Sequence, residues 1–353
     1  MREIQVDLAK IQANYRQLKA LVAPSEVMAI VKANAYGHGM HEVAQALEDI
    51  SVDALGVADL EEAIALRAAG IKSRIMCWIL SAEDDFEMAA EQGIELGVSN
   101  HAVLEAALAA GVKQIHIKVD TGLGRAGFAR SQWQEVFQKL SGKTIGLFSH
   151  LSNTSEAEDL NQEQLFLEAE QVALAAGVKL SQRHLAATAG ALSYPSMRYE
   201  MVRCGIGLYG LNPWEDRGYE EYKLQPVMRA VSQVVNIKRV PAGQGVSYGY
   251  RYRTEKETTL ALVPFGYSEG MPRIAVGAKV LIAGKLFVIS GRVAMDQFVV
   301  DVGDHQVSLG SEVVIFGDPA KGEPSAEELG ASAGTINYEI VTRIGGRAKR
   351  VYL

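Results

Sequence analysis

The chain has 353 residues, of which 48% are hydrophobic and 22% charged, as is ordinary for a globular enzyme. Its formal charge is −7 and its lysines and arginines form no cluster, which argues against nucleic acid as a partner. The first ten residues are too polar for a signal peptide, and no run is long enough to span a membrane, so we expect a cytoplasmic protein that binds no membrane. Cys77 and Cys204 lie in separate strand-like runs without metal-ligand spacing, and they predict neither a disulfide nor a metal site.

A helix is expected first, because apolar residues from Leu8 to Val22 share one helical face and Asp7 can cap it. Strand-like runs then alternate with helical runs, several of which end in glycine. The strand-like runs are residues 27–32, 53–58, 74–79, 94–99, 113–120, 144–150, 180–188 and 201–210. Eight β-then-α units in about 200 residues are typical of a (β/α)8 barrel.

The pattern changes near residue 224, where helical runs give way to strand-like segments separated by glycine, proline or charged turns. Such spacing indicates an all-β domain. These segments are residues 228–240, 258–267, 278–290, 292–302 and 311–317. We therefore predict an α/β fold with a (β/α)8 TIM-like barrel at residues 1–223 and a mainly-β domain at residues 224–353.

The segment VMAIVKANAYGHG (27–39) is an apolar run that reaches Lys32 and then breaks into a turn. Such a lysine either packs its stem and extends its ammonium to solvent, or serves as a Schiff-base nucleophile in carbonyl chemistry. Active sites of barrels lie at the carboxyl ends of the strands. Polar residues gather at these predicted ends, which favours a catalytic cleft: Lys32, Lys118, Asp120, Arg125, His150, His184, Thr188 and Arg203.

Two glycine-containing segments bear on the ligand. GLGRAG (122–127) matches the dinucleotide pattern GxGxxG, but the next strand-like run lacks the acidic residue that such a site needs, so we interpret the segment as a tight backbone near Arg125. A phosphate site after the last two barrel strands is better supported, because Thr188 offers a hydroxyl and Gly205 and Ile206 offer backbone amides. A lysine facing a phosphate site suggests pyridoxal 5′-phosphate, held by Lys32 as a Schiff base.

Eight motifs, in chain order and over nearly the whole chain, resemble those of alanine racemases, the pyridoxal-phosphate enzymes that supply D-alanine for peptidoglycan. They are VKANAYGHG, HIKVDTGLGRAGF, FSHLSNTSE, VRCGIGLYG, GQGVSYGY, VPFGYSEGMPR, GRVAMDQ and TINYEIV. The resemblance implies interconversion of L- and D-alanine by a head-to-tail homodimer in which the β domain contributes to the partner subunit's active site.

The same resemblance implies roles for single residues. Lys32 is expected to hold the cofactor and act as one catalytic base, while Tyr248 from the partner subunit acts as the other, since racemisation needs an acid/base group on each face of Cα. His150 and Arg203 are expected to assist Tyr248, and Arg203 to lie beside the pyridine nitrogen without protonating it. The remaining implied residues are Tyr36, Thr188, Gly205, Ile206 and Tyr338 for the phosphate, Arg125, Met295 and Asp296 for the substrate carboxylate, Tyr267 and Tyr338 for a narrow entrance, and Lys118 as a lysine that is often carbamylated.

Four departures from the family pattern affect the entrance and the surrounding hydrogen bonds: Glu269 replaces the usual Asp, Ala294 a Cys, Ala187 an Asn and Thr188 a frequent Ser. Other readings are weaker. An amino-acid decarboxylase of the same architecture would want an acidic partner for the pyridine nitrogen, where Arg203 is expected; a non-catalytic cofactor carrier would leave the VSYGY, GYSEG and AMDQ motifs unexplained; and a metallohydrolase would need an HxH pair. A broader or serine-preferring racemase remains open.

Overall fold

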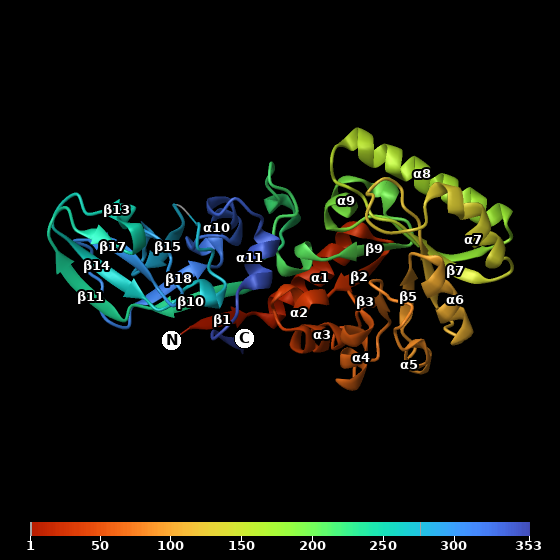
Figure 1. Ribbon diagram of the computed structural model, residues 1–353, viewed down its shortest axis with the longest axis horizontal. Helices are drawn as coiled ribbons and strands as arrows, with labels where there is room; N and C mark the ends of the chain where they lie inside the picture. The colour runs from red at the N-terminus through yellow and green to blue at the C-terminus, as the bar shows by residue number, and fades with distance from the viewer. Residues whose placement is uncertain (1, 276) are drawn as a thin grey trace. The chain divides into compact units, whose positions relative to one another are not determined.

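The structure is a computed structural model that describes residues 2–275 and 277–353 (Figure 1). The chain divides into two compact units. The barrel unit comprises Gln12–Ala35 and Val43–Leu208, and the β unit comprises Met1–Ile11, Tyr36–Glu42 and Tyr209–Leu353. The domain boundary at residue 223 remains a prediction, although the structure groups the first residues of the chain with the β unit.

The barrel unit is built on an eight-stranded parallel sheet in the order β8-β7-β6-β5-β4-β3-β2-β9. Its two edges meet where Ala187 pairs with Arg203, whose N–H donates to the Ala186 carbonyl at 3.0 Å. The expected (β/α)8 barrel is therefore confirmed. Its strands are β2 (Glu26–Ile30), β3 (Ala54–Val57), β4 (Ile75–Cys77), β5 (Glu95–Val98), β6 (Ile115–Lys118), β7 (Thr144–Phe148), β8 (Lys179–His184) and β9 (Met201–Cys204).

Side-chain caps begin most of the longer helices. The predicted cap of the first helix is confirmed, because Asp7 Oδ1 accepts the Lys10 N–H at 3.0 Å. None of the described helices is both long and apolar enough to cross a lipid bilayer. The helices up to residue 193 are α1 (Leu8–Val22), α2 (Lys32–Tyr36), α3 (Met40–Glu48), α4 (Leu60–Ala68), α5 (Phe86–Glu91), α6 (His101–Ala109), α7 (Trp133–Lys139), α8 (Glu156–Ala175) and α9 (Thr188–Ser193).

The described residues of the β unit form three sheets, with orders β16-β15-β18-β10-β1-β19, β11-β14-β17 and β12-β13. It is mainly β, as predicted, but two helices, α10 (Ala326–Ser332) and α11 (Asn337–Arg343), replace the all-β structure that strand spacing indicated. Ser325 and Glu328 form a capping box at the start of α10. The strands are β1 (Glu3–Val6), β10 (Met228–Gln233), β11 (Asn236–Val240), β12 (Gly245–Val246), β13 (Tyr252–Arg253), β14 (Thr258–Val263), β15 (Lys279–Ile282), β16 (Lys285–Val288), β17 (Phe298–Gly303), β18 (Glu312–Phe316) and β19 (Lys349–Tyr352).

Candidate active site

Lys32 follows a strand instead of ending it. Strand β2 stops at Ile30 and Lys32 opens α2, so the expectation of a strand through Lys32 was wrong. The reason is the backbone of residues 33–36, whose φ angles of 52° to 55° are left-handed and cannot continue a strand. This conformation costs L-residues roughly 1–2 kcal/mol each. Glu62 holds the turn by accepting the Ala33 N–H at 2.7 Å. The backbone beside Lys32 is therefore strained, as is common at functional sites.

Five basic groups gather at the carboxyl ends of the barrel strands. Burial and the charges of Arg125 and Arg203 lower the pKa of Lys32. Burial and the same two arginines lower the pKa of Lys118 to about 8. The pKa of His150 lies well below its ordinary value, because the ring is buried and near all four cations. A lowered pKa makes an amine a better nucleophile, and the accumulated positive charge favours an anionic ligand.

Arg203 is a buried cation, and its side-chain hydrogen bonds within the described residues all go to neutral acceptors. It lies in β9 and is 6% exposed. Its guanidinium donates to Nδ1 and the carbonyl of His184, both at 2.8 Å, and to Nδ1 of His150 at 3.1 Å. The carbonyls of Ser149 and Leu185 accept at 2.6 and 2.9 Å. Burial lowers the pKa of Arg203 to about 10, which still leaves it protonated at neutral pH.

Thr188, Gly205 and Ile206 come together in the barrel unit. Strand β8 ends at His184, and Thr188 is the first residue of α9. The Thr188 hydroxyl accepts the N–H groups of Gly205 at 3.2 Å and Gly207 at 3.5 Å. The strand expected through residue 210 ends at Cys204 instead, because a 3-10 turn begins at Ile206. A hydroxyl beside clustered backbone amides is suited to an anion such as phosphate.

The GLGRAG segment forms a turn organised by Asp120. The Asp120 carboxylate accepts the N–H groups of Gly122 at 3.0 Å and Gly124 at 3.1 Å. Gly127 has a φ of +123°, and a Cβ there would lie 2.8 Å from the Asp120 nitrogen. Helix α7 begins only at Trp133, so the segment does not open a helix as a dinucleotide fingerprint does. The turn thus carries Arg125 on a tight backbone, as the sequence indicated.

Two of the predicted phosphate-binding tyrosines lie together in the β unit. The ring centroid of Tyr36 is 6.2 Å from that of Tyr338 and 5.0 Å from that of Tyr209. Burial raises the pKa of Tyr338 to about 12 and also raises that of Tyr36, so both phenols remain protonated and can donate a hydrogen bond. Tyr209 was not predicted to take part.

Tyr248, Tyr267 and Met295 form an exposed tyrosine face on the β unit. Their exposed fractions are 70%, 40% and 54%. Short contacts join their segments: Ser247 Oγ to the Arg292 carbonyl at 2.7 Å, and the N–H groups of Tyr267 and Ser268 to the carbonyls of Ala294 and Met295 at 3.1 and 3.0 Å. Large exposed apolar side chains gathered on one face are typical of an interaction surface.

Glu269, one of the departures from the family pattern, is fully buried. Its carboxylate accepts the Gly266 N–H at 2.8 Å and the Arg347 Nε–H at 2.6 Å. Arg347 also pairs with Asp296 at 2.7 Å. The longer acid therefore closes the turn that carries Tyr267 and, through Arg347, is tied to Asp296.

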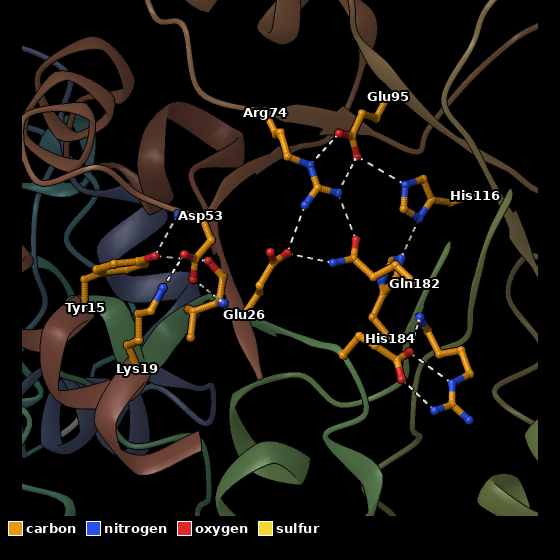
Figure 2. Close-up of polar contacts among 12 residues, drawn as sticks. Tyr15, Lys19, Glu26, Asp53, Arg74, Glu95, His116, Gln182 and His184 are labelled. Carbon is orange, nitrogen blue, oxygen red and sulfur yellow. Dashed lines mark hydrogen bonds and ion pairs between the residues drawn. The ribbon is translucent and has the colours of Figure 1, made fainter. Parts of the chain in front are cut away.

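Three residues connect to Arg203: His184, which was predicted at the cleft but without a role of its own, and His116 and Glu95, which were not predicted. His184 bonds to it directly; His116 Nδ1 lies 3.0 Å from His184 Nε2, and Glu95 Oε2 lies 3.1 Å from His116 Nε2 (Figure 2). Strand periodicity carried a signal for His116, since it lies two residues before Lys118 and thus on the same face of β6. Glu95, at the start of β5, had no comparable signal.

Comparison with known proteins identifies the family. The model "Alanine racemase, N-terminal domain" matches residues 6–213, and "Alanine racemase, C-terminal domain" matches residues 227–352. The chain belongs to the alanine racemase family. An alanine racemase of Thermobifida fusca is 41% identical, covering 99% of this chain and 97% of the relative. One of Beutenbergia cavernae is 40% identical with the same coverage.

Solved structures agree with this assignment to the alanine racemases. The enzyme from Streptomyces lavendulae has a TM-score of 0.95 at 41% identity, covering 100% of this chain and 97% of that chain. The biosynthetic alanine racemase of Pseudomonas aeruginosa has a TM-score of 0.91 at 31% identity, covering 100% and 99%. The resemblance drawn from the eight motifs is therefore confirmed, as is the barrel followed by a mainly-β domain.

Ala294 and Ala187, two further departures from the alanine racemase pattern, contribute backbone groups. Ala294 accepts the Tyr267 N–H through its carbonyl, and Ala187 pairs with Arg203 through its backbone. Neither contact requires the Cys or Asn side chain usual in the family. Within the described residues, no three His, Cys, Asp or Glu side chains are grouped as metal ligands would be.

Proposed function

We propose that this protein interconverts L-alanine and D-alanine with pyridoxal 5′-phosphate as its cofactor, as a homodimer with shared active sites. The observation that carries the proposal is Arg203, a buried cation whose hydrogen bonds within the described residues all go to neutral acceptors, in one cluster with the lowered-pKa amine of Lys32. A carboxylate in that position would favour a decarboxylase. Alanine is proposed as the substrate because the relatives of this chain are named alanine racemase.

The chemistry of the donor set fits this cofactor. Lys32 offers an amine for the aldehyde, and Thr188 with the backbone of Gly205 and Ile206 offers a hydroxyl and amides for the phosphate. Tyr36 and Tyr338 are proposed as phenol donors to the same phosphate. When bound, the cofactor supplies an electron sink for negative charge at Cα of the substrate. Arg203, which keeps its proton, would not protonate the pyridine nitrogen and so would moderate that sink.

Two groups are proposed to exchange the Cα proton from opposite faces, Lys32 on one and the partner subunit's Tyr248 on the other. A phenol has an ordinary pKa near 10 and needs help to act as a base. His150 supports such help: it is neutral, and its Nδ1 accepts from Arg203, so its proton is on Nε2. That N–H would stabilise the phenolate form of Tyr248.

Substrate size and carboxylate binding are assigned to the remaining residues. Arg125 is proposed to bind the carboxylate together with Met295 and Asp296 of the partner subunit, with Lys118, if carbamylated, orienting the arginine. Tyr267 and Tyr338 would narrow the entrance to a methyl side chain, and serine, which adds one hydroxyl, is the alternative substrate. We propose a cytoplasmic protein that supplies D-alanine for peptidoglycan and binds neither nucleic acid nor membrane.

Incubation of the purified protein with L-alanine, and separately with L-serine, tests the proposal. We expect D-alanine as the main product and no carbon dioxide; faster D-serine formation would favour the alternative, and carbon dioxide would indicate a decarboxylase. Lys32→Ala should lose both turnover and the visible absorbance of the bound cofactor. Turnover retained in this variant would refute the assignment of Lys32.

A further inference from the structure

A chain of hydrogen-bonded side chains crosses the interior of the barrel from Arg203 to a carboxylate. Arg203 bonds to His184 Nδ1 at 2.8 Å, His184 Nε2 to His116 Nδ1 at 3.0 Å, and His116 Nε2 to Glu95 Oε2 at 3.1 Å. Figure 2 shows His116 between His184 and Glu95, with Arg74 beside Glu95. The four side chains come from β9, β8, β6 and β5.

The two end groups, Arg203 and Glu95, determine the donor-to-acceptor direction of these hydrogen bonds. Arginine can only donate, so His184 Nδ1 must accept, and the single proton of that neutral ring is on Nε2. This proton is donated to His116 Nδ1, which puts the proton of His116 on Nε2, facing Glu95. An ionised carboxylate can only accept, and it completes the sequence. One arrangement of protons satisfies all three bonds, and it needs a donor-only group at one end and an acceptor-only group at the other.

Burial and neighbouring charges hold His184 and Glu95 in the states that this arrangement requires. The exposed fractions of Arg203, His184, His116 and Glu95 are 6%, 0%, 2% and 5%. His184 stays neutral, because burial and the charge of Arg203 keep its pKa well below the ordinary value. Glu95 stays ionised, because hydrogen bonds from His116 and Arg74 outweigh its burial and lower its pKa to about 2.

Packing also fixes the two rings. The ring of Phe148 stacks on His184 with centroids 4.8 Å apart and an interplanar angle of 9°. Gly146, the register partner of His116 in β7, leaves room for the other ring: a Cβ there would lie 2.0 Å from His116 Nδ1. The barrel interior is therefore shaped to hold an imidazole between His184 and Glu95.

We propose that His116 and Glu95 are positioning residues that fix the His184 ring as an acceptor for Arg203 and thereby orient the guanidinium in the active site. The effect on catalysis rests on the proposed function, in which Arg203 faces the cofactor. Neither residue touches the substrate. Glu95 acts through the rings of His116 and His184, because its carboxylate is the acceptor at the end of this hydrogen-bond chain.

Glu95→Gln and Glu26→Gln form a matched pair that tests this direction. Both acids bind Arg74, Glu95 at 2.7 and 3.1 Å and Glu26 at 2.9 Å, so each change removes one negative charge from the same guanidinium. Only Glu95 contacts His116. In Glu95→Gln the single carbonyl oxygen would face the charged Arg74, and the amide N–H would face His116. The proton of each ring must then move to Nδ1, which sets an N–H of His184 against an N–H of Arg203.

The first readout is the position of the ring protons in the full-length protein, measured from two-bond ¹H–¹⁵N spectra of labelled histidines. We expect His184 and His116 to carry their protons on Nε2 in the native protein and in Glu26→Gln, and on Nδ1 in Glu95→Gln. A native His184 protonated on Nδ1, or rings unchanged in Glu95→Gln, would overturn the proposal. These outcomes do not depend on whether the protein racemises alanine.

The second readout is kinetic. We expect kcat of Glu95→Gln to fall on the order of tenfold to a hundredfold, with KM within about twofold of the native value and Glu26→Gln near native. Equal losses in the two variants would mean a merely structural role. If Glu95→Gln does not fold, His116→Gln and His116→Leu decide: the amide keeps one acceptor and one donor and should retain kcat, whereas leucine should lose it. Equal kcat in these two would also overturn the proposal.

Discussion

Lys118 lies among cations in the barrel, and its charge makes stability depend on pH. Its pKa is about 8 in the folded protein, against an ordinary 10.5, because of burial and the charges of Arg203 and Arg125. Below pH 8 both the folded and unfolded states hold the proton, and the folded state bears the full cost of the buried charge. Above pH 10.5 neither holds it and the cost vanishes, so this group's contribution to stability rises with pH between these values.

Lys118→Met should therefore stabilise the protein at pH 7, and its advantage over the native protein should shrink as pH rises from about 8 to 10.5. Denaturant unfolding in carbonate-free buffer across this range measures the difference, since a carbamate on Lys118 would replace the cation with an anion. Lys113→Met, at an exposed position before the same strand, is the control and should show no such pH-dependent gain. A difference in stability between Lys118→Met and the native protein that stays constant with pH would contradict the lowered pKa of Lys118.

Tyr248→Phe removes the phenol proposed for one face of Cα and leaves Lys32 on the other. Exchange of the Cα proton with solvent should then be lost from one alanine enantiomer much more than from the other, which deuterium incorporation followed by NMR measures. Tyr250→Phe is the matched control, because Tyr250 is a neighbouring tyrosine with 59% exposure and should exchange both enantiomers as the native protein does. Equal loss from both enantiomers in Tyr248→Phe would argue against two bases.

At the scale of residues, residue type and strand-end position predicted the basic residues of the proposed site, and missed His116 and Glu95, which are linked to Arg203 through His184. Lys32, Lys118 and Arg203 stand out because charged groups at strand ends are costly to bury without a use. Glu95 lies at the start of its strand, where a charged residue usually faces solvent. Only the folded barrel shows that its carboxylate points to His116.

The barrel strands show how much of the fold short sequence patterns encode. Each of the eight expected runs contains or overlaps one parallel strand, because buried strands need continuous apolar, β-branched segments. Strand β1 was missed, since Glu3–Val6 is short and its alternation is only apparent once it lies between β10 and β19. Helix α10 could have been found from the serine and glutamate of its capping box.

A turn after Lys32 was predicted, but its left-handed conformation was not predictable from residue preferences. Residues 33–36 read Ala-Asn-Ala-Tyr and contain no glycine, the usual sign of left-handed backbone, yet all four have positive φ. Their conformation depends on a contact distant in sequence, the Glu62 carboxylate on the Ala33 N–H. Local sequence therefore predicted the strand, the lysine and the break after it, whereas the left-handed conformation of residues 33–36 depends on tertiary structure.

Strand β7 offers a test of how closely the barrel is packed around His116. In Gly146→Ala the new Cβ would meet the imidazole at 2.0 Å, so ring and strand must shift. We expect a loss of about 1–3 kcal/mol in the free energy of unfolding, measured by denaturant titration. Gly345→Ala is the control, since the nearest atom to its Cβ is Arg350 Nη2 at 3.4 Å, the end of a flexible side chain. Equal stability of the two variants would mean that the barrel accommodates the methyl group.

At the scale of the whole molecule, the residues of the proposed site are divided between the two units. Lys32, Arg125 and Arg203 belong to the barrel unit, and the tyrosine face of Tyr248, Tyr267 and Met295 belongs to the β unit. That face is exposed in the single chain, and contact with a second copy of the chain would bury its aromatic side chains. In a two-fold dimer any contact of this kind occurs twice, so two equivalent sites would form.

Subunit mixing tests whether those sites are shared. If Lys32 and Tyr248 act from different chains, a hybrid dimer of Lys32→Ala with Tyr248→Phe contains one site with both changes and one with neither. Random exchange of equal amounts makes about half of the dimers hybrid, so about a quarter of the native activity should return. In a control mixture of Lys32→Ala with Arg125→Ala, both changes lie in the barrel unit, every hybrid site keeps one defect, and no activity should return. If Lys32 and Tyr248 instead served the same site from one chain, the first mixture would also stay at the average of its two components, and the shared-site dimer would have to be abandoned.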